Sequence, residues 1–477
     1  MFYPSDVQGP RPVSREPSDH ATNQVVITTV PEAANRELPH ALNVAAGATA
    51  ATSFGDNRID GVLYQLGLRA RSFSRVFVPR TDATTLAAMP KDRATMAARM
   101  ISADYQADED ESGFSRTFKI DFETDVNVAQ VCQALSQSTA VSEVRPNYIS
   151  RILASPSDEF YGFQWGLQAI EAEMGWDIET GHSDLLIAIV DSGIDLQHDD
   201  LKDKLVAGED FVNFQGSLGQ RYIPLGDYQD RDFDPDDEDG HGTHCAGIAG
   251  ASSNNTRGIT GVCWGGKILP VRVMFRVWDR FENRETSIGF DTDIMPGIKF
   301  AIDSGAHVIN LSLGGSNGDA YRPILQAARD RNVCVVAATG NENAGFPPAP
   351  SYPAADPNSL AVGAINSALN RASFSNYGLG YAPFVMAPGV EIASTYKDNG
   401  YVYLQGTSMA TPFVAGLAGL IVSLGLRSGK QLTVDEIYTI IRETATPLGL
   451  GKGDRFYGEG LVNVPAALKA AQEKLDG

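Results

Sequence analysis

The sequence predicts an α/β fold with a mainly parallel sheet, preceded by a small α+β domain, and two patterns carry this expectation. After about residue 154, continuously apolar runs such as "LLIAIV", "HVINLSL" and "NVCVVAAT" alternate with helical segments. Strands that are apolar throughout are typical of a sheet buried on both faces, and alternation with helices indicates parallel pairing. Before residue 154 the pattern instead runs strand, helix, strand.

Three segments follow one another along the chain. Residues 1–60 are rich in Pro, Ala, Ser, Thr and Asn with little periodicity, which predicts a poorly ordered leader. Residues 61–153 combine the alternating "FSRTFKIDF" with the helical "VNVAQVCQALSQS", which predicts the small α+β domain. The linker "ASPSDEFYG" then opens the main domain, residues 154–477.

Composition limits the partners that this chain can have. Its 59 acidic and 38 basic residues give a net charge of −21, which argues against nucleic acid or an anionic membrane as partner. The four cysteines are too scattered to predict a disulfide scaffold. The first residues lack a basic stretch followed by an apolar one. We therefore expect a soluble monomer, either cytoplasmic or exported without a visible Sec-type signal.

Three polar residues stand where a parallel sheet would bring them together. Asp191 ends the strand of "LLIAIVDSGID", His241 begins the helix of "GHGTHCAGIAG", and Ser408 begins the helix of "GTSMATPFVAG". Open α/β sheets place their sites at the carboxyl ends of the strands. An aspartate can fix the tautomer of an imidazole, which then takes the proton of a serine hydroxyl. Taken alone, Ser408 is equally well explained as a helix cap.

In this order, "IAIVDSGID", "GHGTHCAG" and "GTSMATP" resemble the signature segments of the subtilisin-like serine proteases. The similarity runs from about residue 164 to residue 462 and includes "VINLSLGG", "ATGNENAG", "ASFSNYG" and "MAPGVEI". The resemblance implies a subtilisin-like three-layer fold and a serine endopeptidase acting on polypeptides. It also implies that Asp191, His241 and Ser408 form the catalytic triad. An unperturbed imidazole titrates near about 6.5, so activity is expected to fall between about pH 7 and 6.

The resemblance also implies residues that handle the substrate. Asn341 would donate its amide to the oxyanion beside the backbone N–H of Ser408, which suits a side-chain amide at a strand end. Gly314, Gly315 and Gly340 would leave an open pocket for the residue before the scissile bond. The segment "SLGG" resembles the edge that pairs with an extended peptide, as in other strand-addition modes: Ser312, Leu313, Gly314 and Gly315. The insert "MFRVWDRFENRETSIGFDTD" departs from the usual length and leaves the more distant subsites open.

The last segment of the domain over residues 61–153 indicates what that domain does. "VSEVRPNYISRIL" resembles the end of an inhibitory pro-domain, which implies a self-processing zymogen with its own intramolecular inhibitor. An unrelated accessory domain is the alternative. For the function of the whole chain, two alternatives to a self-processing endopeptidase remain. One is a narrow-specificity maturation protease, and the other is a non-catalytic binding protein on the same fold.

Calcium is the expected ion, held by oxygen ligands. The resemblance implies a site formed by Asp158, Asp200 and Asn255, and Asn254 is an alternative to Asn255. The acidic loop before His241 is either solvated or a second calcium site: Asp232, Asp234, Asp236, Asp237 and Asp239.

Zinc is the weaker candidate for a bound metal. His241, His244 and Cys245 are close in sequence, but they do not form an "HExxH" helix. Cys245 follows His241 by four residues on the expected helix, so its thiol should lie near the triad, either as a small buried side chain or as a regulatory group.

Overall fold

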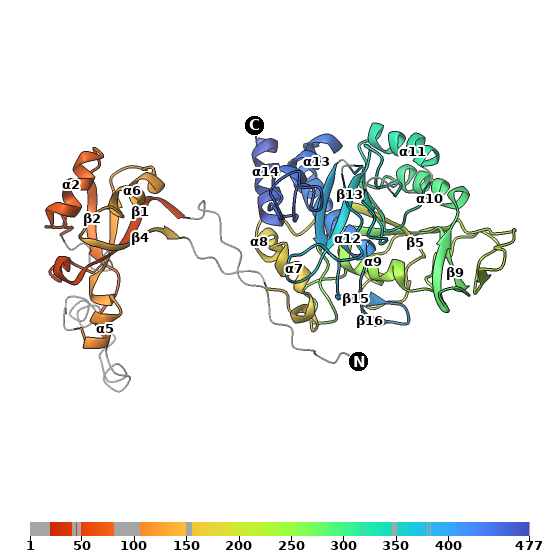
Figure 1. Cartoon of the computed structure of the whole chain (residues 1–477), viewed down its shortest axis with the longest axis horizontal. Helices are drawn as coiled ribbons and strands as arrows, with labels where there is room; N and C mark the ends of the chain where they lie inside the picture. Colours follow the sequence, from red (N-terminus) through yellow and green to blue (C-terminus); the bar gives the residue numbers. More distant parts are fainter. Residues whose placement is uncertain are drawn as a thin grey trace. The chain divides into compact units, whose positions relative to one another are not determined.

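The computed structural model describes residues 20–40, 44, 49–80, 105–148, 155–316, 318–345, 351–378, 380, 381 and 383–476. Contacts within the chain divide it into two units, one over residues 12–152 and the other over residues 153–477 (Figure 1).

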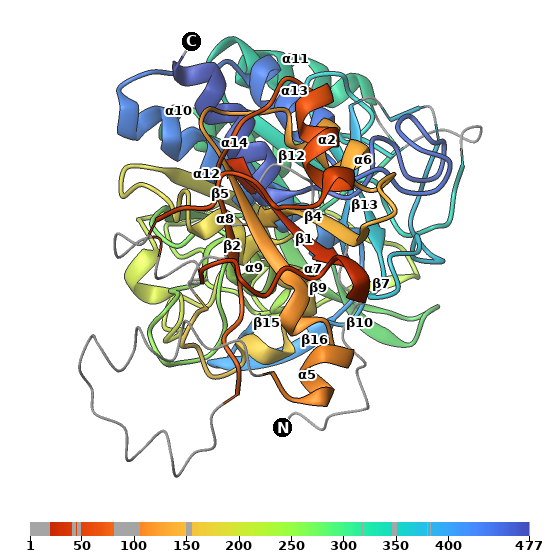
Figure 2. The ribbon, with the colours of Figure 1, turned by 90° about the vertical axis from the view of Figure 1, so that its left-hand side faces the viewer.

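The smaller unit is built on a four-stranded antiparallel sheet with the order β2-β3-β1-β4. Its strands are β1 (His20–Thr29), β2 (Ala70–Arg75), β3 (Thr117–Phe122) and β4 (Val141–Tyr148). The helices α2 (Asn57–Gln65) and α6 (Val128–Leu135) lie side by side (Figure 2), and the short α5 spans Ala107–Glu111. Alternate strand residues such as Val25, Ile27 and Ile120 form a core with both helices.

The expectation of a poorly ordered leader up to residue 60 is wrong where the structure describes that segment. β1 lies inside the sheet, because Ile27 pairs with Phe118 of β3 and with Val144 of β4. Residues 1–19 lie outside the described part of the chain. The run "VVITT" is stabilised by strands about a hundred residues away, which the local composition does not reveal. The small α+β unit therefore begins well before residue 61.

The larger unit confirms the predicted α/β class with a parallel sheet. Its seven strands have the order β14-β13-β12-β11-β5-β8-β6, and every neighbouring pair is parallel. The strands are β5 (Leu186–Asp191), β6 (Glu209–Asp210), β8 (Lys267–Arg272), β11 (Val308–Leu311), β12 (Cys334–Ala338), β13 (Leu360–Ile365) and β14 (Phe384–Pro388).

Helices cover both faces of this sheet and give three layers (Figure 1). On one face lie α9 (His241–Gly250) and α12 (Thr407–Ser428), because a Cβ on Gly419 of α12 would lie 3.1 Å from Ile187 of β5. On the other face, a Cβ on Gly297 of α10 (Asp291–Asp303) would lie 3.1 Å from Val271, and α11 (Gly318–Asp330) packs on β12. By composition α12 could cross a membrane, but 89% of its most apolar window is buried, as in a core helix.

Smaller elements complete the unit. The helices α13 (Val434–Glu443) and α14 (Val464–Asp476) pack on α12, and α7 (Trp165–Ala169) and α8 (Ala172–Trp176) precede β5. β15 (Ile392–Tyr396) and β16 (Gly400–Leu404) form a hairpin. The insert over residues 274–293 supplies β9 (Met274–Asp279) and β10 (Arg284–Gly289), which form a separate antiparallel sheet with β7 (Tyr222–Pro224).

Charged residues lie side by side at the carboxyl ends of three neighbouring strands of the main sheet. Asp191 of β5 is in register with Arg272 of β8, which in turn is in register with Asp210 of β6. Arg272 is 2% exposed and forms ion pairs with the buried Asp210 and, at 3.4 Å, with Asp227 of the following loop. The buried guanidinium is thus paired, as a charge in a protein interior must be.

Candidate active site

Asp191 and His241 form a tight pair at the carboxyl end of the sheet. His241 Nδ1 lies 2.6 Å from Asp191 Oδ1, and the Asp191 side chain is fully buried while the imidazole is 27% exposed. A Cβ on Gly242 would lie 2.1 Å from the carbonyl oxygen of Gly193 and 3.1 Å from Asp191 Cβ. Glycine therefore allows α9 to begin against the end of β5, which brings the imidazole onto the carboxylate.

The charges around His241 favour its protonated form. Burial lowers the pKa of this imidazole, but the attraction and hydrogen bond of Asp191, with the further charges of Asp239 and Asp237, raise the pKa to about 9. The expected loss of activity between pH 7 and 6 assumed an unperturbed imidazole. The structure moves that loss to higher pH.

Ser408 is held beside this pair by its backbone. Its carbonyl accepts hydrogen bonds from Ser312 Oγ at 2.8 Å and from Cys245 Sγ at 3.5 Å. The side-chain ligand atoms of Asp191, His241 and Cys245 all lie within 4.8 Å of one another, so Cys245 connects the start of α12 to the Asp191–His241 pair. Burial raises the pKa of the Cys245 thiol well above its usual range, which keeps it a neutral packing group.

The Ser408 hydroxyl itself is turned toward the substrate edge. Within the part of the chain that the structure describes, Ser408 Oγ donates to the carbonyl of Ser312, at 3.0 Å, rather than to His241. The hydrogen bond between a nucleophile and its base often tightens only when substrate binds.

Asn341 presents one hydrogen-bond donor toward the same place. Its Oδ1 accepts the backbone N–H of Thr407 at 2.8 Å and the Thr407 hydroxyl at 3.1 Å, which fixes the direction of the amide. A Cβ placed on Gly406 would lie 3.5 Å from Asn341 Nδ2 and 3.6 Å from the backbone nitrogen of Ser408. Two nitrogens that carry N–H groups thus lie near one point, as a pair of donors to a developing oxyanion requires.

The predicted substrate edge is only partly free. Ser312 and Leu313 are buried directly after β11, whereas Gly314 and Gly315 are exposed. The N–H and carbonyl of Gly315 already pair with Tyr352, at 2.8 Å each, so Gly315 is not available to pair with a peptide. This corrects the expectation for one of the four residues.

Gly340 has a conformational role in the turn that carries Asn341. Its φ is +99°, and a Cβ there would lie 2.5 Å from Asn376 Nδ2. The sequence analysis missed Asn376, which lies in "ASFSNYG", because that motif contributed only to the family resemblance.

The three predicted calcium ligands are brought together. Asp158 accepts the N–H of Asn254 at 2.7 Å, and Asp200 accepts Asn255 Nδ2 at 3.0 Å and the N–H of Ile259 at 2.9 Å. Burial raises the pKa of Asp200, because the charged carboxylate is poorly solvated there. A bound cation would offset this cost of burying the charge. Asn254 Oδ1 instead accepts the N–H of Ser157, which favours Asn255 as the ligand. Two buried carboxylates and an amide from three separate segments are oxygen donors of the kind that calcium prefers.

One carboxylate of the acidic loop before His241 holds the start of α9, while Asp232, Asp234 and Asp236 are exposed to solvent. Asp237 accepts the N–H groups of Gly240 and Thr243 at 2.8 and 2.9 Å, and the hydroxyls of Thr243 and Ser192 at 2.6 and 2.9 Å. It therefore caps α9, and the sequence analysis missed this function. Among the described residues, no three carboxylates of this loop come close enough together to hold a metal.

The predicted zinc set is not assembled either. His244 Nε2 lies 3.0 Å from the carbonyl of Ile392, and burial lowers the pKa of His244 to about 3. Its Nε2 is thus occupied by a backbone carbonyl of the hairpin strand β15.

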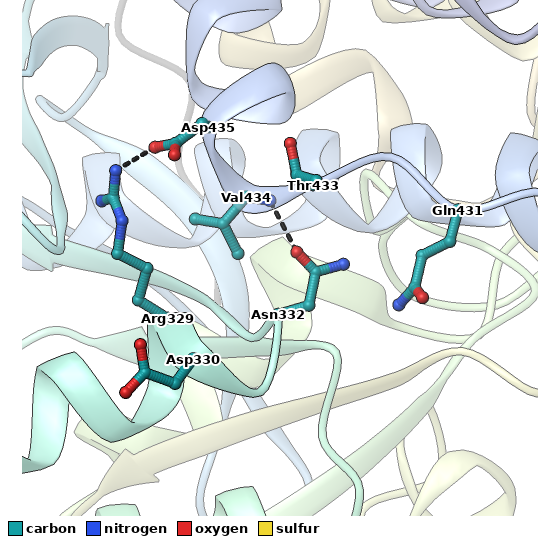
Figure 3. A pocket seen from close by; sticks show the side chains of 7 residues that line it. All are labelled: Arg329, Asp330, Asn332, Gln431, Thr433, Val434 and Asp435. Carbon is teal, nitrogen blue, oxygen red and sulfur yellow. Dashed lines mark hydrogen bonds and ion pairs between the residues drawn. The ribbon is translucent and has the colours of Figure 1, made fainter.

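A surface hollow between α11 and α13 lies at the opposite edge of the sheet, just before β12 begins (Figure 3). Its side chains hold one another. Asn332 Oδ1 accepts the N–H of Val434 at 2.7 Å, and Arg329 pairs with Asp435. The hollow therefore offers structural contacts rather than reactive groups.

Comparison with known proteins places this chain in a family. Residues 182–460 match the model of the subtilase family. The chain is 39% identical over 320 residues to the thermophilic serine proteinase of Bacillus sp. (strain AK1), covering 65% of this chain and 72% of that protein. It is 41% identical over 290 residues to thermitase of Thermoactinomyces vulgaris, covering 59% and 92%. A solved protease of Pseudoalteromonas arctica PAMC 21717 superposes with a TM-score of 0.56 at 29% identity, over 67% of this chain and all of that one. The chain therefore belongs to the subtilase family and is a serine endopeptidase.

Proposed function

We propose that the chain cleaves peptide bonds with Ser408 as nucleophile, His241 as general base and Asp191 as the group that orients the base. The observation that carries this proposal is the 2.6 Å bond between Asp191 Oδ1 and His241 Nδ1, with the start of α12 held beside it. Because Nδ1 is committed to Asp191, Nε2 is the atom that takes the proton of Ser408 and returns it to the leaving amine. Asn341 Nδ2 and the Ser408 N–H stabilise the tetrahedral oxyanion.

The decisive experiment is hydrolysis of casein or of a chromogenic peptide by the purified protein and by Ser408→Ala. The variant should lose activity by several orders of magnitude. A fluorophosphonate probe should label Ser408 and leave the exposed Ser428, at the other end of α12, unmodified. Ser428→Ala is the matched control, which should retain both labelling and hydrolysis. A wild-type protein that hydrolyses nothing would be a binding protein on this fold.

The chain is further proposed to be a self-processing zymogen whose first unit inhibits the second. Support comes from the compact α+β unit within residues 12–152, which precedes the larger unit, and from the resemblance of its last segment to a pro-domain end. Ser408→Ala should then stay full-length when expressed alone. It should be trimmed when active enzyme is added, at the site that N-terminal sequencing identifies. Normal maturation of the variant alone would exclude self-processing.

A structural calcium ion is proposed at Asp158, Asp200 and Asn255. When bound, the ion would cross-link three segments through oxygen ligands and so stabilise the folded state. Asn255 currently turns its Nδ2 toward Asp200, and a half-turn of this amide would present its oxygen instead.

A further inference from the structure

The turn that carries Asn341 is bound along its length by a second segment. This turn, residues 339–345, follows β12 directly. The N–H of Asn343 donates to the carbonyl of Phe374 at 2.6 Å, and the N–H of Tyr377 donates to the carbonyl of Ala344 at 3.0 Å. The turn therefore does not depend on β12 alone for its shape.

One buried side chain makes most of its polar contacts with this turn. Asn376 is 3% exposed. Its Oδ1 accepts the N–H groups of Glu342 at 3.1 Å and Ala344 at 2.7 Å. Its Nδ2 donates to the carbonyl of Thr339 at 2.8 Å and to Glu342 Oε2 at 2.7 Å. All four contacts lie within two or three residues of Asn341, on both sides of it.

The turn is also shaped to admit this amide. A Cβ on Gly340 would lie 2.5 Å from Asn376 Nδ2, so glycine leaves the space that the amide fills. The positive φ of Gly340, +99°, is likewise one that residues with a side chain rarely adopt. Glycine at position 340 thus makes room for the Asn376 amide and also permits the left-handed backbone of the turn.

Asn341 is consequently held from two sides. Thr407 on α12 fixes its Oδ1, and Asn376 fixes the backbone that carries it. We propose that Asn376 is a positioning residue, which sets the oxyanion donor of Asn341 in place before the reaction. This inference rests on the proposed function, in which Asn341 stabilises the transition state. Donors that are already in place need no reorganisation when charge develops, so their placement affects turnover more than substrate binding.

The test is a double-mutant cycle between Asn376 and Asn341. Asn376→Ala should lower kcat about 10 to 100-fold and change KM less than about twofold, because the donor acts only in the transition state. In an Asn341→Ala background, the same substitution should lower kcat by less than about threefold, since there is no donor left to position. Active sites are titrated with a fluorophosphonate, so that kcat refers to competent enzyme only.

Asn332→Ala is the matched control at the other end of the same strand. Asn332 also clamps two segments, through Nδ2 to the carbonyl of Leu432 at 2.8 Å and Oδ1 to the N–H of Val434 at 2.7 Å (Figure 3). Its loss should lower the melting temperature and leave kcat within about twofold. The Asn332 variant thus distinguishes a general loss of stability from an effect on the position of Asn341.

Each outcome decides the question. Independent, multiplying effects of Asn376 and Asn341, a change mainly in KM, or an equal loss of kcat in the Asn332 variant would overturn the positioning role. Asn376→Ser keeps a polar side chain at this position and is the milder second variant. If neither Asn376 variant folds, the residue is structural and the proposal is wrong. A wild-type protein without Ser408-dependent hydrolysis would instead refute the proposed function.

Discussion

Removing one negative charge near His241 should move the pH profile in a known direction. Asp239 accepts the backbone N–H of His241 at 3.2 Å, and it is one of the charges that raise the pKa of this imidazole. Asp239→Asn keeps an oxygen that can accept the same N–H and removes only the charge. The protonated imidazole then loses an attraction, so its pKa falls and the neutral, active form persists to lower pH.

The size of both effects can be worked out. With a pKa of about 9, about 1% of the imidazole is neutral at pH 7 and about 90% at pH 10, so kcat/KM should rise about 90-fold over this range. An unperturbed pKa of about 6.5 would give a rise of only about 1.3-fold. Asp239 ranks after burial and Asp191 among the causes of this pKa, so Asp239→Asn should move the midpoint downward by only part of the difference between about 9 and about 6.5.

The assay is kcat/KM for a chromogenic peptide from pH 5 to 10, since this quantity reports the ionisation of the free enzyme. Asp234→Asn, an exposed carboxylate earlier in the same loop, is the control and should leave the midpoint unchanged. The Asp239 effect should shrink as salt is added, because this carboxylate is only partly buried and charges that water reaches are screened. A wild-type midpoint at or below 6.5, or an equal shift in the Asp234 variant, would refute the reasoning.

Three further substitutions test other parts of the site. Asn341→Ala should lower kcat about 100 to 1000-fold with little change in KM, and a change mainly in KM would assign Asn341 to substrate binding. Asp237→Asn should lower the free energy of unfolding by about 2 kcal/mol, because a buried cap loses acceptors; urea denaturation in the Ser408→Ala background measures this, and a loss equal to that of Asp234→Asn would contradict it. Calcium at about 100 times its Kd should stabilise the Ser408→Ala protein by about 2.7 kcal/mol and raise Tm by a few degrees, and Asp200→Ala should abolish that gain. Equal melting temperatures in calcium and in chelator would exclude the site.

The sequence predicted the site where it depends on local pattern. Asp191 ends an apolar strand, and His241 and Ser408 begin helices, so the rules for parallel sheets place all three at one edge. Asn341 lies in the turn directly after β12, so the same rule places it at that edge. Each of these positions can be recognised from the few residues around it.

Other parts depend on partners that are distant in the sequence. Asn376 acts on a turn more than thirty residues before it, and nothing beside it in the sequence shows which backbone groups it will meet. β1 likewise acquires its identity from β3 and β4. Gly315 looked free to bind a peptide, but Tyr352 occupies its backbone. In each case the pairing is set by tertiary contacts rather than by local propensity.

The charge row across β5, β8 and β6 has a consequence for how the sheet assembles. A shift of β8 by one residue would place Val271 or the following Val273 beside Asp191 and turn Arg272 toward α10. Arg272 would then leave Asp210 and enter the apolar layer, at a cost of about 3 to 5 kcal/mol for breaking a buried ion pair. The neighbouring valines could pack on either face of the sheet after such a shift, whereas Arg272 would lose its buried partner. A charge outside the reaction thus selects the alignment of the strand next to the one that ends in Asp191.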